Sequence, residues 1–396
     1  MSDEKNKSLK RGWRLVKFGE VVRQCKEKAD PETSGLERYV AGDHMDTDSL
    51  RLRRWGVIGS GYLGPAFHIR FRPGQVLYGS RRTYLRKVAV ADFDGICANT
   101  TFVLEPKNPA ELLPDFLPFL MQTEKFNAYS VKNSKGSVNP YINFSDLAEF
   151  AFTLPPRDEQ VRLLQVLSAA EEAIEAHDFA SDALQTMRAS IVEDVLAACF
   201  DPEAVEPLGS FLRDLSYGSS ARSSYEGSGY PILRITNVLR GRVDYSDLQR
   251  IELSQVEYER AALGVGDVLI VRTNGNPQYV GRSVAVDSLP EKTVFASYLI
   301  RLQCDEARMR PAFLAELLNA PSTRQRLRGE VKSSAGNYNI STAGIKKLPV
   351  CVPEFEIQGT LLTTLKEVDS AIAAQATRSF ASRSIKKHLL VELQGA

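Results

Sequence analysis

The chain repeats itself, and this repeat constrains its fold more than any other feature of the sequence. PGQVLYGSRR at 73–82 aligns with VGDVLIVRTN at 265–274, an offset of 192 residues. Further along, KVAVAD at 87–92 aligns with RSVAVD at 282–287. In both copies a glycine turn precedes a run rich in Val and Leu, which is typical of a strand. The sequence therefore predicts two globular units built on one plan.

The repeat continues through a polar turn and a proline step. SKGSVNPYIN at 134–143 aligns with SAGNYNIS at 334–341, and TLPPRDEQ at 153–160 aligns with CVPEFEIQ at 351–358. The last pair stands at an offset of 198 residues and ends on a glutamine in both copies. Each globular unit is thus expected to end at this proline step.

A long helix is predicted after each proline step. Residues 157–199 contain neither Pro nor Gly, and apolar residues recur among them at helical spacing. The same positions return as apolar residues 198 further on, without a gap, as expected of a rigid helix. A lone helix would expose this stripe, so we expect the two helices to pack antiparallel as a coiled coil, each ~60 Å long. The residues expected in the packing are Leu163, Leu167, Ile174, Ile191, Leu361, Leu365, Val368, Ile372, Leu389 and Leu393.

These patterns predict a mixed α/β chain with an internal pseudo-two-fold repeat. In each copy a strand-like run (96–105 and 294–303) leads into short helical stretches (112–130 and 311–329). The predicted order is a flexible N-terminus at 1–11, a globular domain at 12–155, a spacer helix at 156–203, a second globular domain at 204–353 and a second spacer helix at 354–393.

Composition excludes several classes of protein. Five scattered cysteines without C-x-x-C spacing and four separated histidines suggest neither a disulfide framework nor a zinc motif, so no metal is expected. The N-terminal sequence lacks the apolar segment of a signal peptide, and no apolar stretch is long enough to span a bilayer, so we expect a cytoplasmic protein without a membrane partner. The net charge is only +1, but the first third of the chain is rich in arginines interleaved with aromatic residues.

The stretch GSGYLG at 59–64 matches the G-x-G-x-x-G spacing of dinucleotide-binding proteins. That fingerprint requires a helix that begins within the glycines and an acidic residue about 20 positions later. Here Pro65 and an alternating, strand-like segment follow, and the later positions are basic. We therefore interpret the stretch as a glycine-rich turn of a hairpin, with Tyr62 as its most testable residue, and we expect no cofactor. An enzyme with a nucleotide cofactor at this stretch remains the alternative hypothesis.

Other catalytic motifs are missing from the sequence. The nearest approach to an amino-methyltransferase motif, Asn139-Pro140-Tyr141, lacks a proline, and Pro114-Asp115 is not followed by the E-x-K of a nuclease. A phosphate-binding loop of the G-x-x-x-x-G-K-(S/T) type does not occur either. A scaffold protein built on the coiled coil is a further alternative.

The order of elements resembles the DNA specificity (S) subunit of Type I restriction-modification systems over almost the whole chain. The matching motifs are G-S-x-x-x-x-I-N before TLPPRDEQ, G-x-Y-N-I-S before CVPEFEIQ, and the Leu-rich helix after each. The second copy departs from the P-P-x-x-E-Q pattern at Glu354 and Ile357.

The resemblance implies a protein without catalytic activity of its own. It implies two target recognition domains, each reading one half of an asymmetric, bipartite site in double-stranded DNA, separated by helices that fix the spacing. It also implies that the helices dock methyltransferase (modification) subunits, which we expect to number two, and that restriction or translocase subunits can join them.

Sequence-specific binding requires side chains that reach base edges, and other cations to hold phosphates. The loop at 79–87 and its counterpart at 272–282 carry such side chains, and so do the polar turns at 133–139 and 332–339. With Tyr62, the residues expected to contact DNA are Arg81, Arg82, Tyr84, Arg86, Lys87, Lys132, Lys135, Arg272, Asn274, Asn276, Gln278, Tyr279, Arg282, Lys332 and Asn337.

Overall fold

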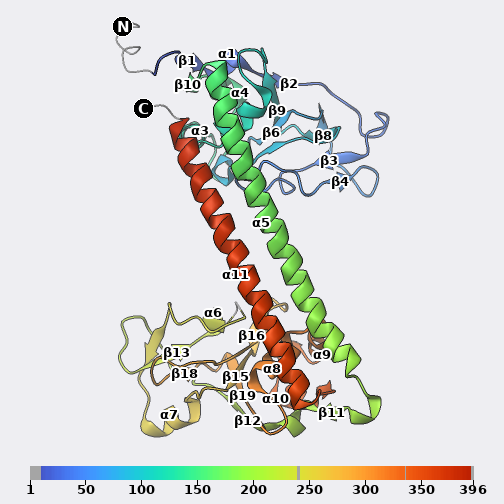
Figure 1. Ribbon diagram of the computed structural model, residues 1–396, viewed down its shortest axis with the longest axis vertical. Helices are drawn as coiled ribbons and strands as arrows, with labels where there is room; N and C mark the ends of the chain where they lie inside the picture. Colours follow the sequence, from blue (N-terminus) through green and yellow to red (C-terminus); the bar gives the residue numbers. More distant parts are fainter. Residues whose placement is uncertain (1–9, 239–240, 335, 394–396) are drawn as a thin grey trace. The chain divides into compact units, whose positions relative to one another are not determined.

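The computed structural model describes residues 10–238, 241–334 and 336–393, which divide into two compact units (Figure 1). Unit 1 comprises the chain up to Asp178 together with the residues from Thr377 onward, and unit 2 runs from Phe179 to Ala376. Of the predicted flexible N-terminus, residues 1–9 lie outside the described residues. Among the described helices, none combines the length and apolar character that crossing a membrane requires.

Unit 1 is built on two four-stranded sheets. In the first the order is β2-β9-β6-β7 with all neighbours antiparallel, and in the second it is β4-β3-β8-β5 with β3 and β8 parallel. Strands β1 and β10 form a separate antiparallel pair. The strands are β1 (Arg14–Lys17), β2 (Val22–Cys25), β3 (Arg38–Val40), β4 (Gly56–Val57), β5 (Phe67–Phe71), β6 (Val76–Gly79), β7 (Val88–Val90), β8 (Gly95–Ala98), β9 (Thr101–Pro106) and β10 (Ala151–Leu154).

Unit 2 repeats this plan. Its four-stranded sheet has the order β12-β19-β15-β17, and a smaller sheet, β14-β13-β18, again contains a parallel pair. A third sheet, β16-β21-β20, is described below. The strands are β11 (Glu206–Pro207), β12 (Leu212–Tyr217), β13 (Tyr230–Leu233), β14 (Gln249–Ile251), β15 (Val268–Val271), β16 (Thr273–Asn274), β17 (Ser283–Ala285), β18 (Val294–Phe295), β19 (Leu299–Cys304), β20 (Lys332–Ser334), β21 (Asn337–Asn339) and β22 (Pro349–Val350).

The predicted repeat is confirmed by this correspondence. The aligned Val-Leu runs form β6 and β15, and both are central strands whose Val and Leu side chains are buried, as expected of strands covered on both faces. The aligned Val-Ala-Val runs form the edge strands β7 and β17. The mixed α/β class is confirmed as well.

Short helices cover the sheets in both units. In unit 1 they are α1 (Phe18–Val21), α2 (Leu117–Met121), α3 (Glu124–Lys132) and α4 (Phe144–Ala148), with single 3₁₀ turns at η2 (Thr83–Leu85) and η3 (Pro114–Phe116). In unit 2 they are α6 (Ile235–Val238), α7 (Gln255–Ala261), α8 (Pro311–Asn319), α9 (Pro321–Gly329) and α10 (Thr342–Lys347), with 3₁₀ turns at η4 (Pro202–Ala204) and η5 (Leu208–Phe211).

The two long helices are α5 (Arg157–Ala198) and α11 (Phe355–Glu392) (Figure 1). They pack together antiparallel. In unit 1, Glu171 of α5 bonds to Lys386 of α11, whereas Asp178, further along α5, bonds to Ser379, which comes earlier in α11. These contacts between the helices are polar.

The apolar residues of the helices serve mainly the cores of the units. Leu163, Leu167 and Leu393 are buried in the core of unit 1, and Leu361 and Leu365 are buried in that of unit 2. Ile174 and Val368 are buried too, and Ile372 is half-buried. At two positions the buried residue is the next one along: Val192 and Leu390 enter the cores, whereas the predicted Ile191 and Leu389 are half-buried beside them.

A fully buried glutamine anchors the first turn of each long helix. The Gln160 amide accepts a hydrogen bond from the Leu113 N–H at 3.0 Å and donates to the carbonyls of Glu111 and Pro155 at 2.8 and 2.9 Å. Gln358 makes the same three bonds in unit 2, to the Arg310 N–H and the carbonyls of Arg308 and Pro353. These equivalent anchors give the constant spacing of the repeat a structural cause.

Candidate nucleic-acid interface

In unit 2 the structure brings the two predicted groups of DNA-contacting residues together. The loop at 272–282 begins with β16, which pairs with β21, and β21 pairs with β20. Asn274 therefore lies opposite Tyr338, and Lys332 lies opposite Asn339. Lys332 and Asn337 are exposed. The loop and the polar turn, about 60 residues apart in sequence, thus form one surface.

In unit 1 the loop and the turn also meet, but through isolated bridges in place of paired strands. Arg81 and Lys135 each form an isolated bridge with Tyr141, so the loop at 79–87 and the turn at 133–139 meet there. The backbone N–H of Arg82 donates to the Pro140 carbonyl at 2.6 Å, and its Nε donates to Oδ1 of Asn139 at 2.9 Å.

A groove lies beside these contacts in unit 1. Its volume is about 660 Å³, and Arg81, Tyr141, Asn99, Asn143, Gln24 and Lys26 are among the residues that line it. Tyr141 is 42% exposed. Tyr141 was not among the residues predicted to contact DNA, although its place in the aligned segment 134–143 was a usable signal.

The loop of unit 1 is held in an unusual backbone conformation. Arg82 and Arg86 flank the single turn η2 and have φ values of 50° and 52°, a region that L-residues other than glycine seldom adopt. Asp48 shares this conformation, with φ 54°, and its carboxylate bonds to Nε of Arg86 at 2.6 Å. The residues brace one another, so the loop presents its remaining side chains from a fixed backbone.

The predicted side chains of unit 1 differ in their availability. Tyr84 and Lys132 are exposed, and the exposed side chain of Arg81 has no ion pair within the described chain. By contrast, Arg86 also pairs with Glu124 at 2.6 Å, Lys87 donates to the Gly42 carbonyl, and Lys135 pairs with Asp146 at 2.7 Å. The candidate contacts of unit 1 are therefore centred on Arg81, Arg82, Tyr84 and Lys132.

The loop of unit 2 is shaped by its own amides. Oδ1 of Asn274 accepts a hydrogen bond from the backbone N–H of Asn276 at 2.8 Å, and Oδ1 of Asn276 accepts one from Gln278 at 3.0 Å. These are successive Asx turns, which order a loop without a regular element. Asn276 and Gln278 remain exposed.

Two arginines at the ends of this loop stack on tyrosines. The Arg272 guanidinium lies 4.7 Å from the centre of the Tyr217 ring and donates to the Ser297 carbonyl at 3.2 Å. The Arg282 guanidinium lies 4.4 Å from the centre of the Tyr279 ring. Stacking of this kind fixes the guanidinium plane and contributes roughly 0.5–1 kcal/mol where it is exposed.

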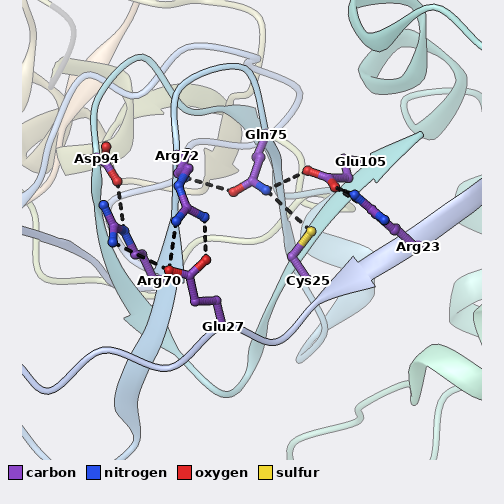
Figure 2. A network of polar contacts seen from close by, with 8 residues as sticks. All are labelled: Arg23, Cys25, Glu27, Arg70, Arg72, Gln75, Asp94 and Glu105. Carbon is purple, nitrogen blue, oxygen red and sulfur yellow. Dashed lines mark hydrogen bonds and ion pairs between the residues drawn. The ribbon is translucent and has the colours of Figure 1, made fainter. Parts of the chain in front are cut away.

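Most arginines that made the first third of the sequence look basic are neutralised by acidic residues. Figure 2 shows one such network: Arg72 binds Glu27 through both terminal nitrogens, and Arg70 binds Asp94 at 3.1 Å. The hydrogen bond from Arg72 lowers the pKa of Glu27. In the same network Gln75 bridges Cys25 and Glu105, and burial, followed by the Glu105 charge, raises the pKa of Cys25 to about 11. Most positive charges of this segment are thus paired with acidic residues of the same chain.

Tyr62 is 92% exposed, in the glycine-rich stretch between β4 and β5. The expected hairpin is wrong, because β4 and β5 occupy opposite edges of the sheet β4-β3-β8-β5. The connection therefore crosses from one edge to the other. The stretch leads into a strand, so it lacks the helix N-terminus that a dinucleotide pyrophosphate requires.

Comparison with known proteins agrees with the fold. Residues 63–180 match the model of the Type I restriction modification DNA specificity domain. The specificity subunit of the Type I restriction enzyme EcoKI of Escherichia coli K12 is 28% identical over 197 residues, which cover 46% of this chain and 42% of that protein. For the EcoDI specificity subunit of Escherichia coli the identity is 26% over 220 residues, 55% of this chain and 48% of that protein. The matches thus span less than half the length of these relatives.

Two solved structures have the same overall fold. One comes from work on complex assembly and conformational transition of a type I restriction-modification system, with a TM-score of 0.60, 19% identity and coverage of 97% of this chain and 98% of that one. The other is the S subunit of a Type I system from M. genitalium, with a TM-score of 0.55, 16% identity and coverage of 98% and 97%. The shared fold is a duplicated α/β unit with two long helices. Over these matched segments the chain is similar to DNA specificity subunits of Type I restriction-modification systems.

Proposed function

We propose that this chain gives a Type I restriction-modification complex its DNA sequence specificity. Each unit reads one half of a bipartite, asymmetric site in double-stranded DNA. The observation that carries the proposal is the repeated juxtaposition of a polar loop with a lysine-bearing turn, once in each unit; the loop is rich in arginine in unit 1 and in amides in unit 2. Arginine and amide side chains are those that pair with guanine and adenine in the major groove.

The two units carry different side chains at equivalent places, which supports an asymmetric site. Unit 1 offers Arg81 and Arg82, where unit 2 offers Thr273 and Asn274. Because arginine favours guanine and asparagine favours adenine, two such loops are expected to select different half-sites.

The long helices are proposed to set the gap between the half-sites and to dock two methyltransferase subunits, which restriction subunits can join. A helix of 42 residues, as in α5, measures about 60 Å, close to two turns of B-DNA at about 34 Å each. The Gln160 and Gln358 anchors support this role, since a helix that sets a distance must be fixed to the domain at its end. The chain itself is proposed to be non-catalytic.

The test uses the chain in complex with its methyltransferase subunits. Arg81→Ala with Arg82→Ala is expected to relax base preference in one half-site only, and Asn274→Ala with Asn337→Ala in the other half only. Arg53→Ala, an exposed arginine of unit 1 outside the loop, is the matched control and should leave both halves unchanged. Preference is measured by selecting bound sequences from randomised DNA. Unchanged preference in both loop variants would refute the proposal.

A further inference from the structure

Helices α3 and α9 occupy equivalent places in the two units but differ in charge. Each has nine residues and buries its third and seventh side chains, Phe126 and Ser130 in α3, and Thr323 and Leu327 in α9. This correspondence places Pro321, Arg324 and Arg328 of α9 where α3 has Glu124, Asn127 and Val131. Unit 2 therefore loses one negative charge and gains two positive charges at these three positions.

In unit 1 the arginine nearest to α3 is paired with acidic residues. Arg86 precedes the edge strand β7, and its guanidinium pairs with Asp48 and Glu124, both at 2.6 Å. The adjoining pocket holds only about 290 Å³. No net positive charge is thus left at Arg86.

In unit 2 the equivalent region is an open groove lined by arginines. Arg282 stands directly before β17, as Lys87 stands directly before β7 one residue after Arg86, and it lines a groove of about 1160 Å³. Arg242, Arg324 and Arg328 line the same groove, together with Gln278. We call this surface the arginine groove.

The two acidic residues that line the groove form ion pairs with Arg188. Glu316 and Asp369 both bind Arg188, at 2.7 and 2.6 Å. Within the described chain no carboxylate pairs with Arg324 or Arg328. The groove is therefore left with positive charge that its own residues do not balance.

The position of Arg324 is fixed by the recognition loop itself. Its Nη1 donates to the Val280 carbonyl at 2.6 Å and its Nη2 to the Gln278 carbonyl at 2.7 Å. Burial, and then the charges of Arg282 and Arg328, lower its pKa to about 10. Like charges held together at a partly buried place are costly unless an anion binds among them.

We propose that the arginine groove binds phosphates of the DNA backbone beside the bases read by the loop at 272–282. This inference rests on the proposed function and adds to it that unit 2 grips the backbone here, whereas unit 1 does not. DNA is the occupant because Gln278 and Arg282 belong both to the groove and to the recognition loop, and because the groove is large enough for more than one phosphate.

The salt dependence of DNA binding by the methyltransferase complex tests the proposal. Each phosphate contact contributes about 0.9 to the slope of log K against log salt concentration, so Arg328→Gln should reduce the slope by about 0.9. Arg324→Lys, which keeps the charge, should retain more of the slope than Arg324→Gln. Arg326→Gln is the matched control, because Arg326 lies on the same helix, donates to the Pro349 carbonyl and does not line the groove.

A second measurement identifies the source of the phosphate. Single methylphosphonate linkages, which carry no charge, are moved along the DNA site. One or two positions beside the half-site of unit 2 should weaken binding by the wild-type complex and have no further effect on Arg328→Gln.

The possible outcomes separate the two proposals. A slope for Arg328→Gln equal to that of Arg326→Gln, with sequence-specific binding intact, would overturn the arginine groove and leave the proposed function standing. The arginine groove would also be overturned if no methylphosphonate position distinguished the wild type from Arg328→Gln. Failure of the wild-type complex to select any DNA sequence would overturn both.

Discussion

Replacement of Gln160 by methionine should loosen the first turn of α5 from unit 1. Methionine is similar in length but cannot replace the three hydrogen bonds, so the Leu113 N–H and the carbonyls of Glu111 and Pro155 lose their partner in a fully buried place. A lost hydrogen bond costs about 1 kcal/mol, and more where a buried group stays unpaired. Three such groups give an expected loss of about 3–5 kcal/mol for Gln160→Met.

The assay is hydrogen exchange on the full chain, followed by peptide across both units. Exchange should accelerate in the peptides around Leu113 and at the start of α5, while peptides of unit 2 keep the wild-type rate. Gln358→Met provides the reciprocal case, because its three bonds lie in unit 2. Gln165→Met, at an exposed position of α5, is the control and should change little. A loss below about 1 kcal/mol, or equal loosening of both units by Gln160→Met, would refute the anchoring role.

Three further predictions concern charge and burial. Lys386 and Glu171 form an ion pair at 2.5 Å, and their side chains are only 8% and 14% exposed. Lys386→Ala should therefore lower the free energy of unfolding by about 3–5 kcal/mol, because it leaves the Glu171 carboxylate buried without a partner. Replacing both residues by methionine should cost much less, and additive losses for the two substitutions would contradict this. Burial raises the pKa of Cys97 and Cys304 to about 12 and that of Cys25 to about 11. Iodoacetamide at pH 8 should therefore leave these three thiols unmodified in the folded chain and modify them in urea. Equal rates of modification in both states would contradict this. The hydrogen bond from Arg72 lowers the pKa of Glu27 in the folded chain, so this bond stabilises the fold above the pKa of Glu27 in the unfolded chain and ceases to do so as the pH falls through the pKa in the folded chain. In urea unfolding, the difference in stability between wild type and Arg72→Gln should therefore shrink below about pH 4. A difference independent of pH would contradict this.

The duplicated framework could be predicted from the sequence because it depends on local patterns. Val-Leu runs after a glycine turn specify strands, and a stretch without Pro or Gly specifies a long helix, wherever they occur in the chain. Both patterns recur at a nearly constant offset, so the sequence predicted the two units and their long helices. The roles of Gln160 and Gln358 did not, since a polar residue in a helix gives no sign that it is buried.

The electrostatics of the candidate interface could not be predicted, because they depend on partners far along the chain. Arg72 pairs with Glu27, 45 residues earlier, and Arg86 pairs with residues 38 positions away on either side. A count of arginines along the sequence therefore overstated the basic character of unit 1. The arginine groove was hidden for the same reason: Arg324 and Arg328 lie on a helix, while the loop that they approach is more than 40 residues earlier.

The hairpin predicted at residues 59–64 failed for a topological reason. Sequence adjacency favours pairing of consecutive strands, but here β3 and β8 lie between β4 and β5. Exposure of Tyr62 is compatible with either connection, so the sequence could not distinguish them.

The central claim is that the two units read two separate half-sites. It is tested most directly by mapping methylated bases across a genome in cells that express this chain with its methyltransferase subunits. The account predicts one asymmetric motif made of two short specified segments, separated by a gap of fixed length in which any base occurs. A continuous motif, or a palindromic one, would contradict it.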